Sequence, residues 1–221
     1  MKNVLINISG ITKSGKTSFG RVLESHLTTG AHSAGFAETS TILEKLCEVI
    51  HNSVPEYSIG PHFKFERFKL GMTPNRTRGR EVAIDFADAV LRKHYGEAVM
   101  VESGVQATYD KARKGLSFTQ WLNNHVAIID SSFAPEWESY LANCQADDWD
   151  KIINLRLDPK TKTECLLRAD SGRGPQANTH VCENYTYQYL IEDLQNQDVR
   201  PMALKQFTDW FNTEIGIQLW S

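Results

Sequence analysis

Near its N-terminus the chain reads Asn3-Val4-Leu5-Ile6-Asn7-Ile8-Ser9, then Gly10-Ile11-Thr12-Lys13-Ser14-Gly15-Lys16-Thr17, then Ser18-Phe19-Gly20-Arg21-Val22-Leu23-Glu24-Ser25-His26-Leu27. The first segment is a short apolar run, and the third carries apolar residues at helical spacing. The middle octet fits the pattern G-x-x-x-x-G-K-[ST] of a phosphate-binding loop, which needs a strand before it and a helix after it. This stretch therefore predicts an α/β fold that begins with a strand, the loop and a helix.

The residue types of the octet suit a triphosphate. Two glycines allow the backbone N–H groups to converge on an anion, and the helix N-terminus adds about half a positive charge there. Lys16 can reach the β- and γ-phosphates, and the Thr17 hydroxyl is placed to coordinate Mg²⁺. The alternative is a glycine-rich turn without a ligand. We expect a site for ATP and Mg²⁺, and the residues expected to bind the donor are Gly10, Lys13, Ser14, Gly15, Lys16, Thr17 and Ser18.

Length and composition fit a single domain. The chain has 221 residues and a formal net charge of −3, which gives no strong global attraction to a polyanion. Its four cysteines include no C-x-x-C pair, so neither a zinc site nor a disulfide framework is indicated. No apolar run approaches the length of about 20 residues that crosses a bilayer. We expect a protein of the cytoplasm, the host cytoplasm if a phage encodes it.

Four further apolar segments have the character of strands: residues 33–37, 98–101, 126–129 and 151–157. With the first strand they predict a mostly parallel five-stranded sheet with helices on both faces. The C-terminal part, from Tyr185 to Phe211, reads as helices that pack on this sheet. We expect one P-loop domain over 1–221, with the phosphate loop at 10–17, an acceptor region at about 36–95 and a small lid at about 168–180.

Acidic residues follow three of these predicted strands: Glu38, Glu102 and Asp130. In an open α/β sheet such residues lie beside the crevice where ligands bind. A Mg²⁺-nucleotide site needs one acid for the metal and one to orient the attacking group. We expect Thr17 and Glu102 to hold the metal, Glu102 and Asp130 to act in catalysis, and Glu38 to face the substrate. Each acid could instead be a helix cap or a solvated first-turn carboxylate.

Arginines gather in two polar segments. Arg78 and Arg80 precede an amphipathic helical pattern, where they oppose the helix dipole unless an anion is present. Since guanidinium matches phosphate geometry, we expect both to bind a substrate phosphate. Arg168 and Arg173 bracket a flexible segment that could close over the nucleotide and act in catalysis. The alternatives are a surface ion-pair cluster for the first pair and an exposed loop for the second.

Taken together, these segments resemble the deoxynucleoside monophosphate kinases of bacteriophages, a branch of the P-loop nucleotide kinases. The resemblance covers nearly the whole chain, although only the phosphate loop is specific by itself. It rests on Gly10 to Thr17, Phe36-Ala37-Glu38, Arg78-Gly79-Arg80-Glu81, the run from Ala127 to Glu136, the strand Ile152 to Leu157, and His180-Val181-Cys182-Glu183. The corresponding family patterns are F-A-[DE], T-P-R-E, I-x-D-x-R-F-x-N-E and H-x-S-E.

The resemblance implies a role for each matched residue. Lys13, Gly15, Lys16 and Thr17 would bind the donor, Arg78 and Arg80 the acceptor phosphate, and Arg168 and Arg173 would belong to the lid. The chain departs from the family at Thr17, where the family has Asp, and at Ser132, where it has Arg. Thr is the commoner P-loop residue, so the metal site stands, whereas a lost arginine can mean a different acceptor.

Three functions follow from these features. The first is ATP-dependent phosphoryl transfer to a deoxynucleoside monophosphate. The second keeps the donor site and phosphorylates a hydroxymethylated pyrimidine in DNA. The third is a non-catalytic nucleotide-binding switch. The expected partner is a small nucleotide acceptor, with DNA less favoured because of the net charge of −3, no membrane, and a homodimer left open.

Overall fold

The computed structural model describes residues 3–10, 14–28, 33–39, 41–43, 45, 91–114, 125–130, 134–143, 149–158, 187–192 and 199–216. Its strands are β1 (Val4–Gly10), β2 (Ser33–Glu38), β3 (His125–Asp130), β4 (Lys151–Asp158) and β5 (Tyr189–Glu192). They form one sheet in the order β2-β3-β1-β4-β5, and every pairing is parallel. The expected α/β class with a five-stranded sheet is confirmed, and this strand order is typical of P-loop kinases.

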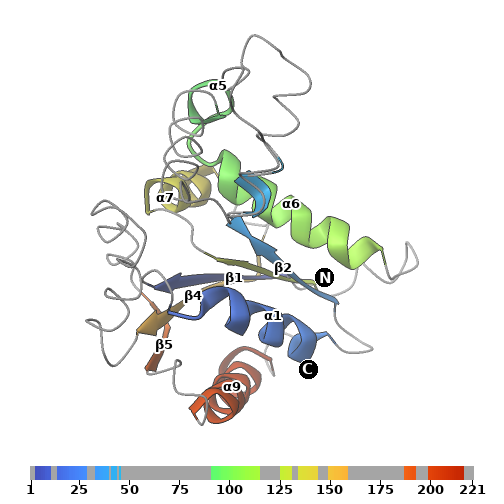
Figure 1. Cartoon of the computed structure of the whole chain (residues 1–221), viewed down its shortest axis with the longest axis vertical. Helices are drawn as coiled ribbons and strands as arrows, with labels where there is room; N and C mark the ends of the chain where they lie inside the picture. The colour runs from blue at the N-terminus through green and yellow to red at the C-terminus, as the bar shows by residue number, and fades with distance from the viewer. Residues whose placement is uncertain are drawn as a thin grey trace, which may run out of the picture.

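Helices cover both faces of the sheet, as Figure 1 shows. One face carries α1 (Lys16–Leu27), α9 (Val199–Trp210) and the π-helical turn η5 (Phe211–Gly216). The other carries α6 (Val99–Arg113) and α7 (Ala134–Asn143), and the short α5 (Lys93–Tyr95) precedes α6. Because both faces are covered, the central strands are apolar along nearly their whole length.

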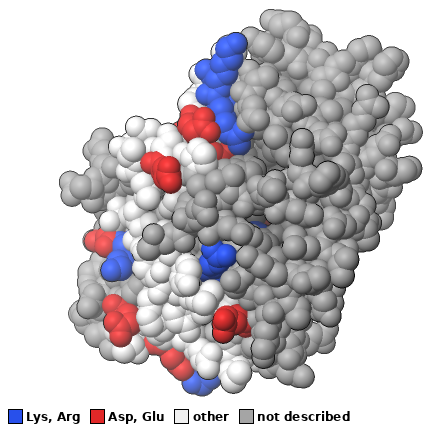
Figure 2. Space-filling view, turned by 90° about the vertical axis from the view of Figure 1, so that its left-hand side faces the viewer, with Lys and Arg blue, Asp and Glu red and all other residues white. Residues whose placement is uncertain are grey.

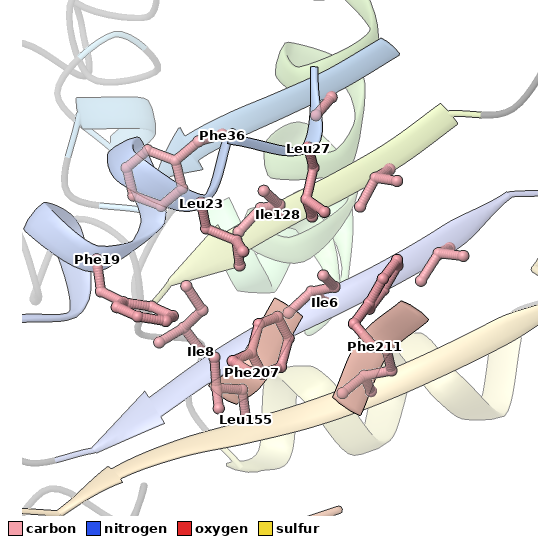
Figure 3. Close-up of a cluster of buried hydrophobic side chains, with 14 of the residues drawn as sticks. Ile6, Ile8, Phe19, Leu23, Leu27, Phe36, Ile128, Leu155, Phe207 and Phe211 are labelled. Carbon is pink, nitrogen blue, oxygen red and sulfur yellow. The ribbon is translucent and has the colours of Figure 1, made fainter. Parts of the chain in front are cut away.

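The core under α1 and α9 follows from the alternation of side chains along the strands. Val4, Ile6 and Ile8 of β1 point to this face and are fully buried. Figure 3 shows the side chains that meet them from α1, α9, η5 and the neighbouring strands: Phe19, Leu23, Leu27, Phe36, Ile128, Leu155, Phe207 and Phe211. This packing fixes α1, and with it the end of the phosphate loop, against the sheet.

The second core lies under α6 and α7. Leu5 of β1 and Ala127 and Ile129 of β3 point to this face, where they pack with Met100, Val101 and Trp137. The Trp137 ring is stacked against Tyr140, with the ring centroids 5.9 Å apart. The sheet is thus held from both sides.

The predicted strand at residues 98–101 is wrong. These residues form the start of α6, in which Met100, Val101, Gly104 and Thr108 are buried at helical spacing. The fifth strand is instead β5, in the C-terminal part that was expected to be helical. The helical expectation for that part is confirmed at α9. The number of strands was therefore right although one of the five was wrongly placed.

A buried histidine joins the N-terminal ends of β2 and β3 to α6. His125 is 1% exposed, with Nδ1 2.9 Å from Ser33 Oγ and Nε2 3.1 Å from Thr108 Oγ1. The Thr108 hydroxyl donates to Val105 O at 2.7 Å, so Nε2 carries the hydrogen and donates to Thr108. Nδ1 then accepts from Ser33, and the neutral ring stacks on Tyr109. Burial lowers the pKa of His125 to about 4, against the opposing hydrogen bond at Ser33.

A second buried polar contact joins α7 to the segment before α5. Glu136 is 1% exposed and accepts from Arg92 Nε at 3.1 Å and from Arg92 Nη2. Arg92 Nε also lies 3.6 Å from a carboxylate oxygen of Glu97. A buried pair of this kind holds its two elements in one relative position, because separating them would leave a charge without its partner.

The described surface carries charges of both signs. Figure 2 shows acidic and basic side chains interspersed over the described part of one face. Ion pairs occur between exposed residues, such as Lys205 and Asp209 on α9, where Nζ lies 2.6 Å from Oδ2. Among the described residues, no helix combines the length and the apolar character that a membrane span requires.

Candidate nucleotide-binding site

The phosphate loop starts at the end of the central strand β1 and leads into α1. Gly10 and Gly15 have φ of 140° and 93°, conformations that residues with a side chain rarely adopt. A Cβ on Gly10 would also lie 2.9 Å from Ser14 Oγ. Both glycines of the motif are therefore required by the backbone path, as the sequence predicted. Lys16 begins α1, so the N–H groups of its first turn open toward the loop.

Two polar side chains of the loop are placed for an anion. Lys16 Nζ donates to the carbonyl oxygen of Gly10 at 2.8 Å, so the ammonium group folds back across the loop. Ser14 is 1% exposed, and its hydroxyl has no hydrogen-bond partner among the described residues. A buried hydroxyl without a partner is costly, and an oxygen of a bound phosphate would satisfy it. The loop thus fits a phosphate group.

Thr17 meets two carboxylates at the carboxyl edge of the sheet. Its hydroxyl lies 2.9 Å from Asp130 Oδ2 at the end of β3 and 3.4 Å from Glu38 Oε1 at the end of β2. Glu38 and Asp130 are register partners in adjacent strands, so both side chains point to the α1 face. The structure therefore brings together three of the predicted site residues.

Asp130 is held from the first residue after β2. It is 1% exposed, and its Oδ1 accepts the backbone N–H of Thr39 at 3.1 Å. The Thr39 hydroxyl donates to the Asp130 carbonyl oxygen. Burial raises the pKa of the Asp130 carboxyl above its usual range, and the hydrogen bonds from Thr39 and Thr17 oppose this rise. The positive charge of Lys16 opposes it further. A divalent cation beside this carboxylate would favour the ionised form.

Glu38 is held by a residue that the sequence reasoning missed. Arg21 Nη2 lies 3.3 Å from Glu38 Oε2, on the outer side of the cluster. The Arg21 side chain is 68% exposed, and that of Glu38 is 26% exposed. The available signal was the spacing, because Arg21 follows Thr17 by one helical turn and shares its face of α1.

The expected role of Glu102 depended on the wrongly predicted strand. Glu102 lies in the first turn of α6 and is exposed, on the face of the sheet opposite to Thr17. Its position is that of a first-turn carboxylate favoured by the helix dipole, the alternative considered from the sequence. The argument that made it a metal ligand and a catalytic residue is removed. Asp130 takes the place beside Thr17 that was expected for Glu102.

The remaining predicted residues divide into two groups. Ser18 is described and exposed in the first turn of α1. Lys13, Arg78, Arg80, Arg168 and Arg173 lie outside the described residues, as do most of the predicted acceptor region and the predicted lid. Their roles therefore stay predictions.

The chemistry of the cluster suits a magnesium ion that arrives with phosphate. Among the described residues, no three His, Cys, Asp or Glu side chains gather as a ligand set for a metal. Mg²⁺ in nucleotide sites is held by one or two protein oxygens, and phosphate oxygens and water complete its shell. Thr17 and Asp130 supply oxygens of that kind. The residues present fit Mg²⁺ bound together with a nucleotide.

Comparison with known proteins leaves the function to these residues. No family model matches the chain, and no curated protein matches it. Among solved structures it is similar to a protein from Chloroflexus aurantiacus J-10-fl described as a "putative kinase", with 13% identity and a TM-score of 0.44. The match covers 96% of this chain and 97% of that one. A similarity this distant carries no argument about function, which rests on the site itself.

Proposed function

We propose that this chain is a P-loop phosphotransferase that moves the γ-phosphoryl group of ATP to a nucleotide acceptor. The observation that supports this most directly is the contact between the Thr17 hydroxyl, directly after the phosphate loop, and Asp130 at the end of the neighbouring strand. A hydroxyl and a carboxylate in this relation are the protein oxygens that P-loop enzymes use beside Mg²⁺.

The donor would lie along the loop from Gly10 to Thr17. The backbone N–H groups at the start of α1 and the buried Ser14 hydroxyl would donate to phosphate oxygens. Lys16 would exchange its contact with the Gly10 carbonyl oxygen for the β- and γ-phosphates. Each of these groups is positive or a hydrogen-bond donor, so together they stabilise the negative charge that accumulates during the transfer.

Thr17 and Asp130 would hold Mg²⁺, directly or through water. The ion would supply charge neutralisation between the β- and γ-phosphates. The chain's own part is positioning, because Asp130 is fixed by the Thr39 N–H and by burial and so presents one oxygen toward Thr17. Transfer of this kind needs no covalent intermediate, and most of the rate comes from orientation and electrostatics.

Two acceptor classes follow from the sequence. By resemblance the acceptor is a deoxynucleoside monophosphate, with Arg78 and Arg80 on its phosphate and Arg168 and Arg173 in a closing lid. The second class is a hydroxymethylated pyrimidine, whose hydroxyl group is the acceptor. The position of Glu38 bears on the choice between them and is taken up in the next subsection.

The donor site is tested with Lys16→Ala. Since Lys16 neutralises the transferred group, the variant should lower ADP release in the presence of acceptor by at least about 100-fold. The matched control is Lys205→Ala, which removes an exposed lysine on α9 that pairs with Asp209. If Lys16→Ala turns over at the wild-type rate, the donor site is assigned wrongly. If the wild type binds ATP and transfers phosphate to no acceptor, the chain is a nucleotide-binding switch and the proposed function fails.

A further inference from the structure

The two carboxylates beside Thr17 differ in what surrounds them. Asp130 is 1% exposed and is fixed by the Thr39 N–H at 3.1 Å and by Thr17 at 2.9 Å. Glu38 is 26% exposed, and its distance of 3.4 Å from Thr17 is the longer one. Asp130 is therefore the better candidate for the metal, and Glu38 lies on the more open side of the pair.

Glu38 is placed by a row of contacts between α1 and β2. On successive turns of α1, Thr17 and Arg21 contact the Glu38 carboxylate, and Glu24 Oε1 accepts the backbone N–H of Phe36 at 2.9 Å. The Phe36 ring packs closely over Gly20, where an added Cβ would collide with it. The same helix that carries the phosphate loop thus fixes the position of Glu38 relative to the loop.

Glu24 also fastens this row from the other face of the sheet. Lys111 Nζ of α6 lies 2.5 Å from the Glu24 carboxylate, which is 15% exposed. Because β2 is the edge strand, α1 and α6 meet across its free edge through this ion pair. An edge strand that is held from both helical layers keeps the carboxylate at its end in one place.

A carboxylate next to the γ-phosphate constrains the acceptor. A phosphate monoester carries close to two negative charges at neutral pH, so a neighbouring carboxylate repels it. Arg21 offsets little of this repulsion, since exposed ion pairs contribute weakly. A hydroxyl group is neutral and donates a hydrogen bond to a carboxylate, and it must lose its proton when it attacks phosphorus. The position of Glu38 suits a hydroxyl acceptor and disfavours a phosphate acceptor.

We propose that Glu38 faces the acceptor and receives the proton of a hydroxyl group, so that the chain phosphorylates a primary hydroxyl of a nucleoside or nucleotide unit. This inference rests on the proposed phosphotransferase function. In the step, the hydroxyl oxygen forms a bond to the γ-phosphorus while the bond from that phosphorus to the bridging oxygen of ADP breaks. ADP leaves with the electron pair, the hydroxyl proton passes to a Glu38 carboxylate oxygen, and the product is a phosphate monoester.

The acceptor class is read from the product. The wild-type chain with Mg²⁺ and ATP is offered thymidine, thymidine monophosphate, 5-hydroxymethyldeoxyuridine as nucleoside and as monophosphate, and duplex DNA that contains hydroxymethyluracil. Phosphorus NMR distinguishes a new phosphate monoester from a new phosphoanhydride. A monoester is the expected product. The substrate that yields it distinguishes a sugar hydroxyl from a base hydroxymethyl group, and a free unit from DNA.

The role of Glu38 is tested with Glu38→Gln, and the matched control is Glu192→Gln at the exposed end of the other edge strand, β5. Glutamine still accepts a hydrogen bond but is a far weaker base, so turnover should fall by at least about 100-fold. Binding of the acceptor without ATP or Mg²⁺, and binding of Mg²⁺-ATP without acceptor, should both stay within about threefold by calorimetry. The control should change none of these values.

Four results would overturn the proposal. A phosphoanhydride product from a monophosphate would leave the phosphotransferase function standing and refute the hydroxyl acceptor. Turnover of Glu38→Gln within about threefold of wild type would remove Glu38 from the reaction. Loss of Mg²⁺-dependent ATP binding in that variant would make Glu38 part of the metal site. Bound ATP without transfer to any acceptor would refute the proposed function itself. If Glu38→Gln does not fold, Glu38→Asp keeps the carboxylate and should retain turnover above that of Glu38→Ala.

Discussion

Lowering the pH should destabilise the fold through His125, at the end of β3 remote from the nucleotide site. The folded chain keeps this ring neutral, because Nε2 donates to Thr108 and Nδ1 accepts from Ser33 in a buried environment. In the unfolded chain the ring is exposed and takes up a proton at its ordinary pKa. Since the folded pKa is the lower one, stability from this group is complete above the unfolded pKa and is lost as the pH falls toward the folded one.

The size of the effect follows from the two pKa values. Burial lowers the pKa of His125 from 6.5 to about 4, and each pH unit between them is worth about 1.4 kcal/mol. The full loss is therefore about 3 kcal/mol, reached below pH 4. At pH 5 the unfolded ring is almost fully protonated and the folded ring is not, so about 2 kcal/mol is already lost. A domain has only about 5–15 kcal/mol in total.

The assay compares urea unfolding at pH 7.5 and pH 5.0, followed by tryptophan fluorescence, for wild type and His125→Gln. The glutamine amide can still donate toward Thr108 but cannot be protonated in this range. Asp130 lies at the opposite end of β3, about 16 Å away, so its titration cancels in the difference between the two proteins. Wild type should lose about 2 kcal/mol more than the variant. Equal losses in the two proteins would refute the assignment of a neutral buried ring.

Three further substitutions test the site and the packing. Asp130→Asn should weaken Mg²⁺-dependent ATP binding by about 10-fold or more and leave ATP binding in EDTA unchanged, as calorimetry would show. Gly35→Ala should cost about 2 kcal/mol by urea unfolding, because its Cβ would lie 2.5 Å from a backbone oxygen of α6. Gly104→Ala should cost less, since its nearest neighbour is a methyl group at 3.3 Å. Glu136→Gln should cost about 3 kcal/mol, and much less when Arg92→Met is also present.

The start of the fold could be predicted because its signals are local. The apolar run of β1, the glycines of the loop and the apolar spacing of α1 lie within one stretch and agree with one another. Gly10 and Gly15 take positive φ, which the motif requires of those positions. Local sequence and backbone geometry determine each other here, so the donor site was identified correctly where the structure describes it.

The prediction was wrong at residues 98–101 because a short apolar run fits either a buried strand or a buried helix. The wider window held the information, since the buried positions of α6 continue through Gly104 and Thr108 at helical spacing. The missed strand, Tyr189–Glu192, is an edge strand in which one residue, Ile191, is fully buried. A half-exposed edge strand of four residues has little apolar pattern to find.

The composition of the acidic cluster could not be read from the sequence, because it depends on which strands are neighbours. Glu38 and Asp130 are 92 positions apart in the chain and become register partners only when β2 pairs with β3. Nothing local specifies a parallel pairing of that separation. Glu102 looked equivalent to both until the fold assigned it to a helix on the other face.

The same pairing also gives the two acids different surroundings, and this decides what each can do. β3 lies between β1 and β2, so Asp130 is enclosed on both sides and beneath Thr17, whereas Glu38 ends the edge strand and has no strand beyond it. An enclosed carboxylate beside a hydroxyl can hold a metal ion but cannot reach an arriving substrate. A carboxylate at the edge is open to the acceptor. Strand order alone therefore separates the metal-binding acid from the acid that meets the acceptor, and an acidic side chain at either position would acquire the role of that position.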